Sequence, residues 1–510
     1  MTVKDITSKM GIAEQEDFAL VERAFEYSKE AHKNQKRYSG EPYFIHLFET
    51  AKNLAELGAD AKTVSAGLLH DVIEDGHRDR EEVRKEFGDE ILFLIEGVTK
   101  LGKLKYHGVE RHVGSLRKLF VAMSKDIRVL IIKLTDRLHN METLQYVPEE
   151  KRQRIALETL EVYAPLAYRL GMNRLNRRLE DLSFEYTHPK EFLEIKKILK
   201  ERSKETQERL EKILRSIKKN LAKEGFRNFS TDFRLKGVHS FYQKLKRKKI
   251  VENIYDISAI RIVVPTESDC YRVLGIIHSS WRPLPGRIKD YIAFPKPNGY
   301  QSIHTTVFTG DGGFVEIQIR TEEMHRHAEY GIASHLSYKD DSKKSKFKKN
   351  IPFSWIERLL PKSEKTQKTT VPTAEKPKKE PLSNSLPAWV KHLADDELTS
   401  EESEEFLENL RGDFLRHRMF VFTPKGDPID LPLYSTSVDF AYAIHSEIGD
   451  HMFGAKVNGK LVSLDTPLIN GDTIEIITKS SSKPSPKWLD YTHTAVARHH
   501  IRSSLSKSKR

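Results

Sequence analysis

The segment LLHDVIEDGH, residues 68–77, places four ionisable side chains directly after two leucines. If the segment is one helix, His70, Asp71, Glu74 and Asp75 fall within an arc of about 140°, because each residue advances by 100°. Four such groups beside an apolar stripe would repel one another unless a cation or a proton lay among them. Taken alone, however, the pattern is more often the solvent-exposed edge of an ordinary helix.

Two further segments favour a metal site. GEPYFIHLFETA (40–51) places His46 on an apolar helical stretch, and VLIIKLTDRLHN (129–140) places Asp136 and Asn140 one turn apart. Histidines and carboxylates from separate helices form a coordination set for a divalent cation. Such an ion lowers the pKa of bound water and polarises a phosphoryl oxygen, and neighbouring carboxylates can then take the proton.

The first half of the chain predicts helices, and the pattern of apolar residues changes near Phe226. Residues 1–185 have apolar positions at helical spacing, and residues 186–225 continue as an amphipathic connector, either one long helix or two. IYDISAIRIVVP (254–265) and SIHTTVFTGDGGFVEIQIRT (302–321) alternate like strands, and the second contains a hairpin turn. We therefore expect a mixed α/β unit over residues 226–340.

The last third of the chain is more varied. Residues 341–412 are polar and charged for most of their length, so we expect a linker that is partly disordered. Residues 413–480 contain short strands around glycine turns and predict a small β-rich module. The basic residues 481–510 begin a further helical region.

Composition limits the class of protein. A chain of 510 residues is too long for one core, and its net charge of +12 suggests polyanionic partners. The single cysteine, Cys270, suits a reducing compartment. The N-terminal segment lacks the apolar core of a signal peptide, and no apolar run reaches the roughly 18 residues of a membrane span. We expect a cytoplasmic protein.

A second group of chemical side chains lies in the α/β unit. Asp256 begins one predicted strand, and Glu316 shares one face of another with Gln318 and Arg320. Strand alternation alone favours a solvated sheet face. The segment GRIKDYIAFPKPNGYQSIHTTV (286–307) favours a site instead, because it mixes cations with a turn expected to expose Tyr300. An aromatic ring among cations suits a purine stacked above its phosphates.

The helical half resembles a known family. KRYSGEPYFIH (36–46), LLHDVIED (68–75) and KLTDRLHNMETL (133–144) are similar to the all-helical HD-type hydrolase domain of bifunctional RelA/SpoT (Rel) enzymes. These enzymes handle guanosine tetra- and pentaphosphate, (p)ppGpp. The resemblance implies a site of three groups of residues: Mn²⁺ ligands His46, His70, Asp71 and Asp136; carboxylates Glu74 and Asp75 for the attacking water; and nucleotide contacts Arg37, Asn140 and Thr143.

The α/β half resembles the synthetase domain of the same family, in its Arg-x-Lys-Asp form at residues 287–290. The resemblance implies a nucleotidyltransferase-like fold that transfers pyrophosphate from ATP to the 3′-hydroxyl of GDP or GTP. Asp256 and Glu316 would hold Mg²⁺, with Glu316 as ligand, general base or both, and Tyr300 would stack on guanine. The implied phosphate and nucleotide contacts are Arg234, Lys236 and Lys244 for ATP, and Lys289, Lys296 and His304 around the acceptor, with Arg287 as a further nucleotide contact.

The β-rich module from Met419 resembles a TGS domain, a small β-grasp fold. The resemblance implies contact with the ribosome and uncharged tRNA, with His445 near the tRNA 3′ end; a plain docking module is the alternative. Family members usually continue into further regulatory domains. Whether this chain is a piece of a longer protein or a short member therefore stays open.

The patterns predict a multidomain α and α+β protein, and the resemblance to the Rel family implies an enzyme of the stringent response that both makes and hydrolyses (p)ppGpp. Two alternatives remain. His239 and Gln243 replace the tyrosine and lysine that are commoner in the family, which would suit a hydrolase with a weak or degenerate synthetase. The second alternative is a regulator that binds tRNA or the ribosome and whose catalytic sites are vestigial. We also hypothesise that the 189–221 helices couple the two sites into opposed states.

Overall fold

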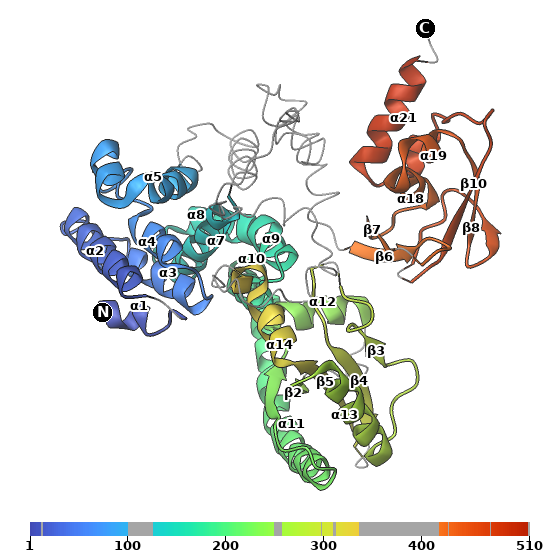
Figure 1. Ribbon diagram of the computed structural model, residues 1–510, viewed down its shortest axis with the longest axis horizontal. Coiled ribbons are helices and arrows are strands. Elements are labelled where there is room, and N and C mark those ends of the chain that lie inside the picture. The colour runs from blue at the N-terminus through green and yellow to red at the C-terminus, as the bar shows by residue number, and fades with distance from the viewer. Residues whose placement is uncertain are drawn as a thin grey trace, which may run out of the picture. The chain divides into compact units, whose positions relative to one another are not determined.

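The computed structural model describes residues 1–11, 14–99, 126–248, 258–296, 298–309, 313–335, 418–426, 428–469 and 471–507. The chain divides into two compact units. The described residues up to 335 belong to the first unit and those from 418 onward to the second, and each is described by itself (Figure 1).

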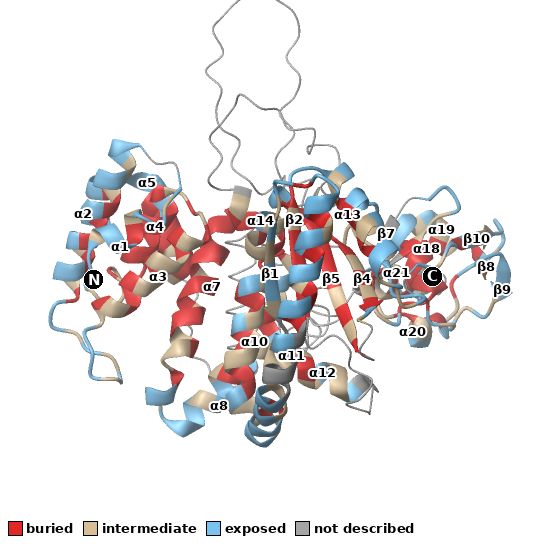
Figure 2. Ribbon diagram, turned by 90° about the horizontal axis from the view of Figure 1, so that it is seen from below, coloured by how far each residue is buried: buried red, intermediate tan, exposed pale blue. Residues whose placement is uncertain are grey.

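The first part of the larger unit, here called the helical half, is built from helices, as the apolar spacing predicts. They are α1 (Val3–Thr7), α2 (Gln15–Ala31), α3 (Phe44–Glu56), α4 (Ala61–Leu69), α5 (Arg80–Thr99), α7 (Ile127–Glu142), α8 (Glu149–Glu158), α9 (Ala164–Arg169) and α10 (Asn173–Thr187), with a 3₁₀ turn at Leu144–Tyr146 and a π turn at Thr159–Tyr163. Most residues of α4 and α7 are buried (Figure 2), which places their polar residues in a water-poor interior.

The expectation of one helix through residues 68–77 is wrong. Helix α4 ends at Leu69, and residues 70–76 form turns. The His70 Nδ1 atom lies 2.8 Å from the Gly67 carbonyl oxygen, and a continuing helix would give that oxygen to the amide of Asp71. The Asp75 amide still donates to the Asp71 carbonyl at 2.8 Å. Asp71 and Asp75 therefore remain one turn apart although the helix has ended.

The connector is one helix, α11 (Pro189–Lys223), which decides between the two alternatives. Proline at its first position suits a helix start, because the missing amide hydrogen has no partner there. Its C-terminal half contributes Leu210, Ile213, Ile217 and Leu221 to the core under the sheet. Near its other end Ile195 packs against Phe241 of α12 (Val238–Lys248).

The α/β half comprises α11 to α14 and a five-stranded sheet with the order β1-β2-β5-β4-β3. The strands are β1 (Ser230–Leu235), β2 (Ser258–Val264), β3 (Lys289–Asp290), β4 (Ile303–Phe308) and β5 (Phe314–Thr321). Strands β2 and β5 are parallel, and the other pairs are antiparallel. The hairpin predicted at 302–321 is confirmed, and α13 (Glu267–Ser280) covers the same apolar face as α11. Helix α14 (Glu322–Tyr330) follows β5 directly.

The smaller unit contains two small sheets, β6-β7 and β10-β8-β9. Its elements are β6 (Arg418–Phe422), β7 (Pro428–Pro432), α18 (Ser437–Ile444), α19 (Ser446–Asp450), β8 (Met452–Val457), β9 (Lys460–Val462), β10 (Ile474–Thr478), α20 (Trp488–Tyr491) and α21 (Ala495–Lys507). The buried Asp439 carboxylate accepts hydrogen bonds from the amides of His493 and Thr494, which ties α21 to the module. The helix expected in the basic tail is therefore present.

The predicted fold class, helical domain followed by a mixed α/β domain and a small β-rich module, is confirmed by these elements. The predicted linker at 341–412 lies outside the described residues. Among the described helices, none combines the length and the apolar composition that crossing a membrane requires.

Candidate active sites

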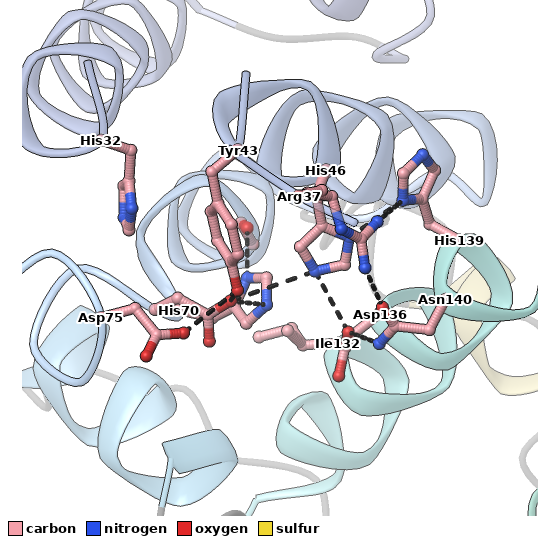
Figure 3. Close-up of polar contacts among 12 residues, drawn as sticks. His32, Arg37, Tyr43, His46, His70, Asp75, Ile132, Asp136, His139 and Asn140 are labelled. Atoms are coloured by element: carbon pink, nitrogen blue, oxygen red, sulfur yellow. Dashed lines mark hydrogen bonds and ion pairs between the residues drawn. The ribbon is translucent and has the colours of Figure 1, made fainter. Parts of the chain in front are cut away.

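Three helices of the helical half bring a cluster of metal-ligating atoms together. His46 from α3, His70 at the end of α4 and Asp136 from α7 are buried, and one ligand atom of each lies within 4.8 Å of the others (Figure 3). The distance from His46 Nε2 to Asp136 Oδ1 is 3.2 Å. The Asp71 Oδ2 atom lies 3.2 Å from His70 Nε2 and 4.0 Å from His46 Nε2. The four predicted ligands therefore converge.

The chemistry of this cluster fits a divalent cation. The His70 Nδ1 atom faces a carbonyl oxygen, which can only accept, so Nδ1 carries the proton of the neutral ring and Nε2 presents its lone pair. That Nε2 atom is buried and makes no hydrogen bond among the described residues. A lone pair facing the Asp71 carboxylate is an unfavourable contact that a cation or a proton between them relieves.

The charges of the cluster depend on one another. Although burial disfavours the charged ring, Asp71 and Asp136 raise the pKa of His70 to about 9. Burial likewise opposes ionisation of the two aspartates, but His70 holds the pKa of Asp71 well below its usual range, and Lys133 and His46 do the same for Asp136. A proton on His70 thus neutralises part of the carboxylate charge, and metal binding would release it.

The predicted proton-handling carboxylates lie beside the cluster. The Tyr43 hydroxyl, one turn before His46, lies 2.8 Å from Asp71 Oδ2 and 3.1 Å from Asp75 Oδ2. Asp75 is exposed and Glu74 is half-buried in the same turn. Tyr43 therefore connects a predicted metal ligand to a predicted proton acceptor.

The three predicted nucleotide contacts also meet at this site. The Arg37 guanidinium donates to Asn140 Oδ1, and its Nη1 lies 3.2 Å from Thr143 Oγ1 and 3.0 Å from His139 Nδ1. Thr143 also donates to the His139 carbonyl oxygen at 2.9 Å, so it bonds within its own helix as well. Asn140 donates to Asp136 Oδ1 at 2.6 Å, which joins this group to the metal cluster.

Three side chains of this site were not among the predicted residues: Tyr43, Lys133 and His139. Each lies three positions from a predicted ligand, which is about one helical turn. The Lys133 ammonium group lies 2.7 Å from Asp136 Oδ2. The signal in the sequence was therefore the helical spacing around His46 and Asp136.

The second site is a cavity of about 250 Å³ on the polar face of the sheet. Its lining comes from both halves of the larger unit: Tyr168, Asn173, Asn176, Arg177, Arg234, Lys236, Gly237, Ser240, Ala259, Lys296, Asn298, Tyr300, His304, Glu316 and Gln318. Six of the predicted synthetase residues are in this set. Lys244, Arg287 and Lys289 are not part of the lining, and Asp256 lies outside the described residues.

Glu316 is the anionic centre of the cavity. Strand register aligns Glu316 with Ala259 of β2 and Thr306 of β4, so its side chain shares the polar face with those of Gln318 and His304. The His304 Nδ1 atom lies 3.2 Å from Glu316 Oε1, and Gln318 Nε2 donates to the same oxygen at 2.8 Å. Burial raises the pKa of Glu316, but the hydrogen bonds from His304 and Gln318 outweigh it and hold that pKa at about 2.

The expectation that the turn at 297–300 is exposed is wrong for the residues described there. Tyr300 is 7% exposed and Asn298 is 3% exposed. The reason is the helical half: the Asn298 side-chain amide donates to the Tyr168 carbonyl oxygen at 3.2 Å. The Tyr300 hydroxyl lies 2.8 Å from His304 Nε2, and the Lys296 ammonium lies 5.0 Å from its ring centre. Burial lowers the pKa of Lys296 to about 8.

The part of the cavity wall contributed by α9 and α10 was missed by the sequence analysis. Arg177 of α10 pairs with Glu329 of α14 at 3.1 Å, and the same carboxylate also accepts from Arg261 and Arg320. Arg320 is fully buried, and its Nε and Nη1 atoms make no hydrogen bond among the described residues. Three arginines therefore surround Glu329, and the cavity itself is lined by four Lys or Arg side chains and one carboxylate, Glu316, which suits a polyanionic ligand.

The predicted tRNA contact lies in the smaller unit. His445 is exposed, and its Nδ1 accepts a hydrogen bond from the Glu447 amide at 3.3 Å, which caps the N-terminus of α19. This contact gives His445 a local structural role and leaves its prediction as a tRNA contact untested.

Comparison with known families matches three segments of the chain. Residues 24–173 match the HD domain, residues 233–343 match a region found in RelA / SpoT proteins, and residues 419–478 match the TGS domain. The first segment contains the His/Asp cluster, and the second contains most of the residues that line the cavity, including Glu316.

Several curated proteins are similar over nearly the whole chain. A GTP pyrophosphokinase from Streptomyces coelicolor is 44% identical over 96% of this chain and 56% of its own length. Guanosine-3′,5′-bis(diphosphate) 3′-pyrophosphohydrolases from Aquifex aeolicus and Borreliella burgdorferi are 43% and 41% identical, over 96% and 95% of this chain and 65% and 68% of their own lengths. The chain thus spans between about half and two thirds of the length of these relatives.

Proposed function

The chain belongs to the RelA/SpoT family, and from this membership we propose that it is a bifunctional alarmone enzyme. One site would hydrolyse (p)ppGpp to GDP or GTP and pyrophosphate, and the other would make (p)ppGpp from ATP and GDP or GTP. The observation that supports both activities is that the chain contains both a buried His/Asp cluster and a basic cavity around Glu316 that is lined by six of the predicted synthetase residues.

At the hydrolase site, His46, His70, Asp71 and Asp136 would hold Mn²⁺. The ion would supply Lewis acidity, which lowers the pKa of water and polarises the phosphoryl oxygen. Glu74 or Asp75 would accept the proton of the attacking water, and the Tyr43 hydroxyl would orient Asp75. The group of Arg37, Asn140 and Thr143 would bind the nucleotide beside the ion.

At the synthetase site, Glu316 and Asp256 would hold Mg²⁺. A carboxyl group with a pKa of about 2 is a weak base at neutral pH, so the ligand role suits Glu316 better than the role of general base. Arg234, Lys236 and Lys296 would neutralise the phosphates that move between the nucleotides. The proposed stacking of guanine on Tyr300 requires Lys296 to leave its position over the ring.

The remaining proposed contacts lie outside this cavity or outside the larger unit. Lys244 would contribute to the ATP site, Lys289 would contact the acceptor nucleotide from the edge strand β3, and Arg287, which lies just before that strand, would be a further nucleotide contact. The TGS module, with His445, would contact the ribosome and uncharged tRNA, which are cytoplasmic partners.

Paired assays test the two activities separately. The full chain is incubated with ATP, GDP and Mg²⁺, and separately with guanosine tetraphosphate and Mn²⁺, and nucleotides are separated by chromatography. We expect Asp71→Ala to abolish hydrolysis and to leave synthesis, and Glu316→Gln and Asp256→Ala to do the reverse. Losses of about 10³-fold or more are typical when a group that stabilises the transition state is removed.

Each substitution serves as the folding control for the other. Hydrolysis that survives Asp71→Ala would contradict the first site, and synthesis that survives Glu316→Gln would contradict the second. If the wild-type chain hydrolyses but does not synthesise, the hydrolase with a degenerate synthetase is the correct description. If the wild-type chain has neither activity, the regulator that binds tRNA or the ribosome is the correct description.

A further inference from the structure

His139 of α7 lies between Arg37 and the predicted ligand His46. Its Nδ1 atom is 3.0 Å from Arg37 Nη1 and 2.9 Å from His46 Nδ1 (Figure 3). His139 and His46 are buried, at 6% and 2% exposed, so bulk water does not compete for the hydrogen bonds between these side chains. Two ring nitrogens at this distance must share one proton, because two bare lone pairs or two N–H groups would repel.

Arg37 decides which ring carries that proton. A guanidinium group has only donors and keeps its charge in proteins, so the His139 Nδ1 atom that faces it must accept. The same Nδ1 lone pair can then accept from His46, which favours a proton on His46 Nδ1. The Asp136 carboxylate, whose Oδ1 lies 3.2 Å from His46 Nε2, accepts a hydrogen bond from that nitrogen in the metal-free site and favours the opposite tautomer. A cation bound at Nε2 would replace this hydrogen bond, and it needs the tautomer that Arg37 and His139 favour.

We propose that His139 is a positioning residue that, with Arg37, keeps His46 in the tautomer whose Nε2 can bind a divalent cation. The inference rests on the proposed hydrolase function, because it concerns a residue that would act through a metal ligand. The neighbouring ligand His70 needs no such device, since its Nδ1 faces the Gly67 carbonyl oxygen at 2.8 Å. The two histidines thus obtain the same tautomer from different partners.

Partners of this kind hold a metal-binding ring in place and fix its proton, and their loss typically weakens metal affinity by 10- to 100-fold. Here the partner is a neutral ring rather than a carboxylate. His139 Nδ1 accepts a hydrogen bond because the Arg37 guanidinium faces it. The same guanidinium also bonds to Asn140 and Thr143. The ligand geometry is therefore connected to the residues proposed to bind nucleotide.

Amide substitutions at position 139 test this inference in the full chain. The side-chain oxygen of asparagine lies the same number of bonds from Cβ as Nδ1 of histidine, whereas that of glutamine lies one bond farther out. His139→Asn can therefore keep an acceptor between Arg37 and His46, and His139→Gln and His139→Leu cannot. Mn²⁺ affinity is measured by titration of the metal-free protein, with free Mn²⁺ followed by electron paramagnetic resonance.

We expect His139→Gln and His139→Leu to raise the Kd for Mn²⁺ at least about tenfold, and His139→Asn to stay within about threefold of wild type. Leu138→Ala is the matched control, because Leu138 is a buried neighbour on the same helix. It should lower the melting temperature through lost packing and leave the Kd within about threefold of wild type.

The inference is overturned if His139→Gln binds Mn²⁺ like wild type, if His139→Asn is as weak as His139→Gln, or if Leu138→Ala weakens binding equally. Failure of the proposed function gives a different result. Asp136→Ala should abolish the same Mn²⁺ binding, and if it does not, the cluster is not the metal site. The glutamine variant keeps the experiment decisive if His139→Leu does not fold.

Discussion

At the scale of single residues, the metal cluster could be predicted because its ligands recur at helical spacing around apolar residues. His46, His70 and Asp136 are indeed buried together. The residues that fix their protons and charges, Lys133 and His139, were not predicted. Helical spacing predicts which residues face the interior. Which of those residues contact one another depends on how the three helices cross, and no local sequence pattern reveals the crossing.

Lys133 provides a test at this scale, because its ammonium group lies 2.7 Å from the buried Asp136 carboxylate. We expect Lys133→Met to cost the metal-free protein about 3–5 kcal/mol, since it removes the cation that balances a buried carboxylate. Saturating Mn²⁺ should recover part of the loss, because the ion compensates the same charge and binds only the folded state. Thermal unfolding with and without Mn²⁺ measures both effects.

Lys62→Met is the control for this prediction. Lys62 pairs with Glu90, but both side chains are about half exposed, so the pair contributes at most about 1 kcal/mol. Its loss should not depend on Mn²⁺. Equal destabilisation of Lys133→Met in the presence and absence of Mn²⁺ would show that Lys133 does not balance the charge of the cluster.

At the scale of elements, the β4–β5 hairpin and the alternation of β5 followed from the sequence, because side chains alternate strictly across a strand. The end of α4 did not follow. It depends on one side-chain contact, from His70 to the Gly67 carbonyl, in a segment whose apolar pattern would equally suit a longer helix. Local side-chain bonds of this kind compete with helix formation and are invisible to periodicity.

Gly331 gives a test at this scale, because it joins α14 to the helical half with φ at +57°. A Cβ atom there would lie 2.1 Å from the Leu170 carbonyl oxygen and 2.4 Å from the Gly171 carbonyl carbon. Gly331→Ala should therefore destabilise the larger unit by on the order of 3 kcal/mol or more, from strain and overlap together. Chemical denaturation measures the loss.

Gly286→Ala separates strain from overlap. Gly286 has φ at +70°, and nothing lies within 4 Å of the position a Cβ would take. Its substitution should cost only the strain, about 1–2 kcal/mol. If both substitutions lower the free energy of unfolding equally, the close backbone contact is not the reason that position 331 requires glycine.

At the scale of the whole larger unit, helix α10 packs against α7, which carries Asp136 and Asn140, and it also lines the cavity of the second site. Arg178 of α10 pairs with Glu142 at the end of α7, Arg177 pairs with Glu329 of α14, and Asp181 bonds to the N-terminus of α12. The hypothesis that residues 189–221 couple the sites stays untested, and these contacts favour α10 as the physical link. The sequence could not reveal this, because contacts between distant segments leave no periodic trace.

Asp181 allows a test of the contact between α10 and the synthetase site. Its carboxylate accepts from the His239 amide at 2.9 Å, at the N-terminus of α12, where backbone amides favour an anion. It thus occupies a position that suits an ATP phosphate. We expect Asp181→Ala to lower the KM for ATP several-fold in synthesis, although the helix loses a cap worth about 1 kcal/mol.

Thr266→Ala is the matched control for Asp181→Ala. The Thr266 hydroxyl caps α13, on the apolar side of the sheet, by accepting from the Asp269 amide at 3.2 Å. Its loss should cost similar stability, about 1 kcal/mol, without changing the KM for ATP. A KM for ATP that is unchanged or raised in Asp181→Ala would mean that Asp181 is a helix cap and nothing more.

The backbone contact at Gly331 has one mechanical consequence. The Ile332 amide donates to the Leu170 carbonyl at 2.9 Å, and the Asn173 side-chain amide donates to the Ala328 carbonyl at 2.7 Å, so one main-chain and one side-chain hydrogen bond join the two halves. Separating the two halves would break these hydrogen bonds, whereas a rotation of one half about the contact between residues 170–173 and 328–332, here called the seam, would keep them. The seam is therefore suited to serve as a pivot, and any opening of the cavity should be a rotation about residues 170–173 and 328–332 rather than a separation.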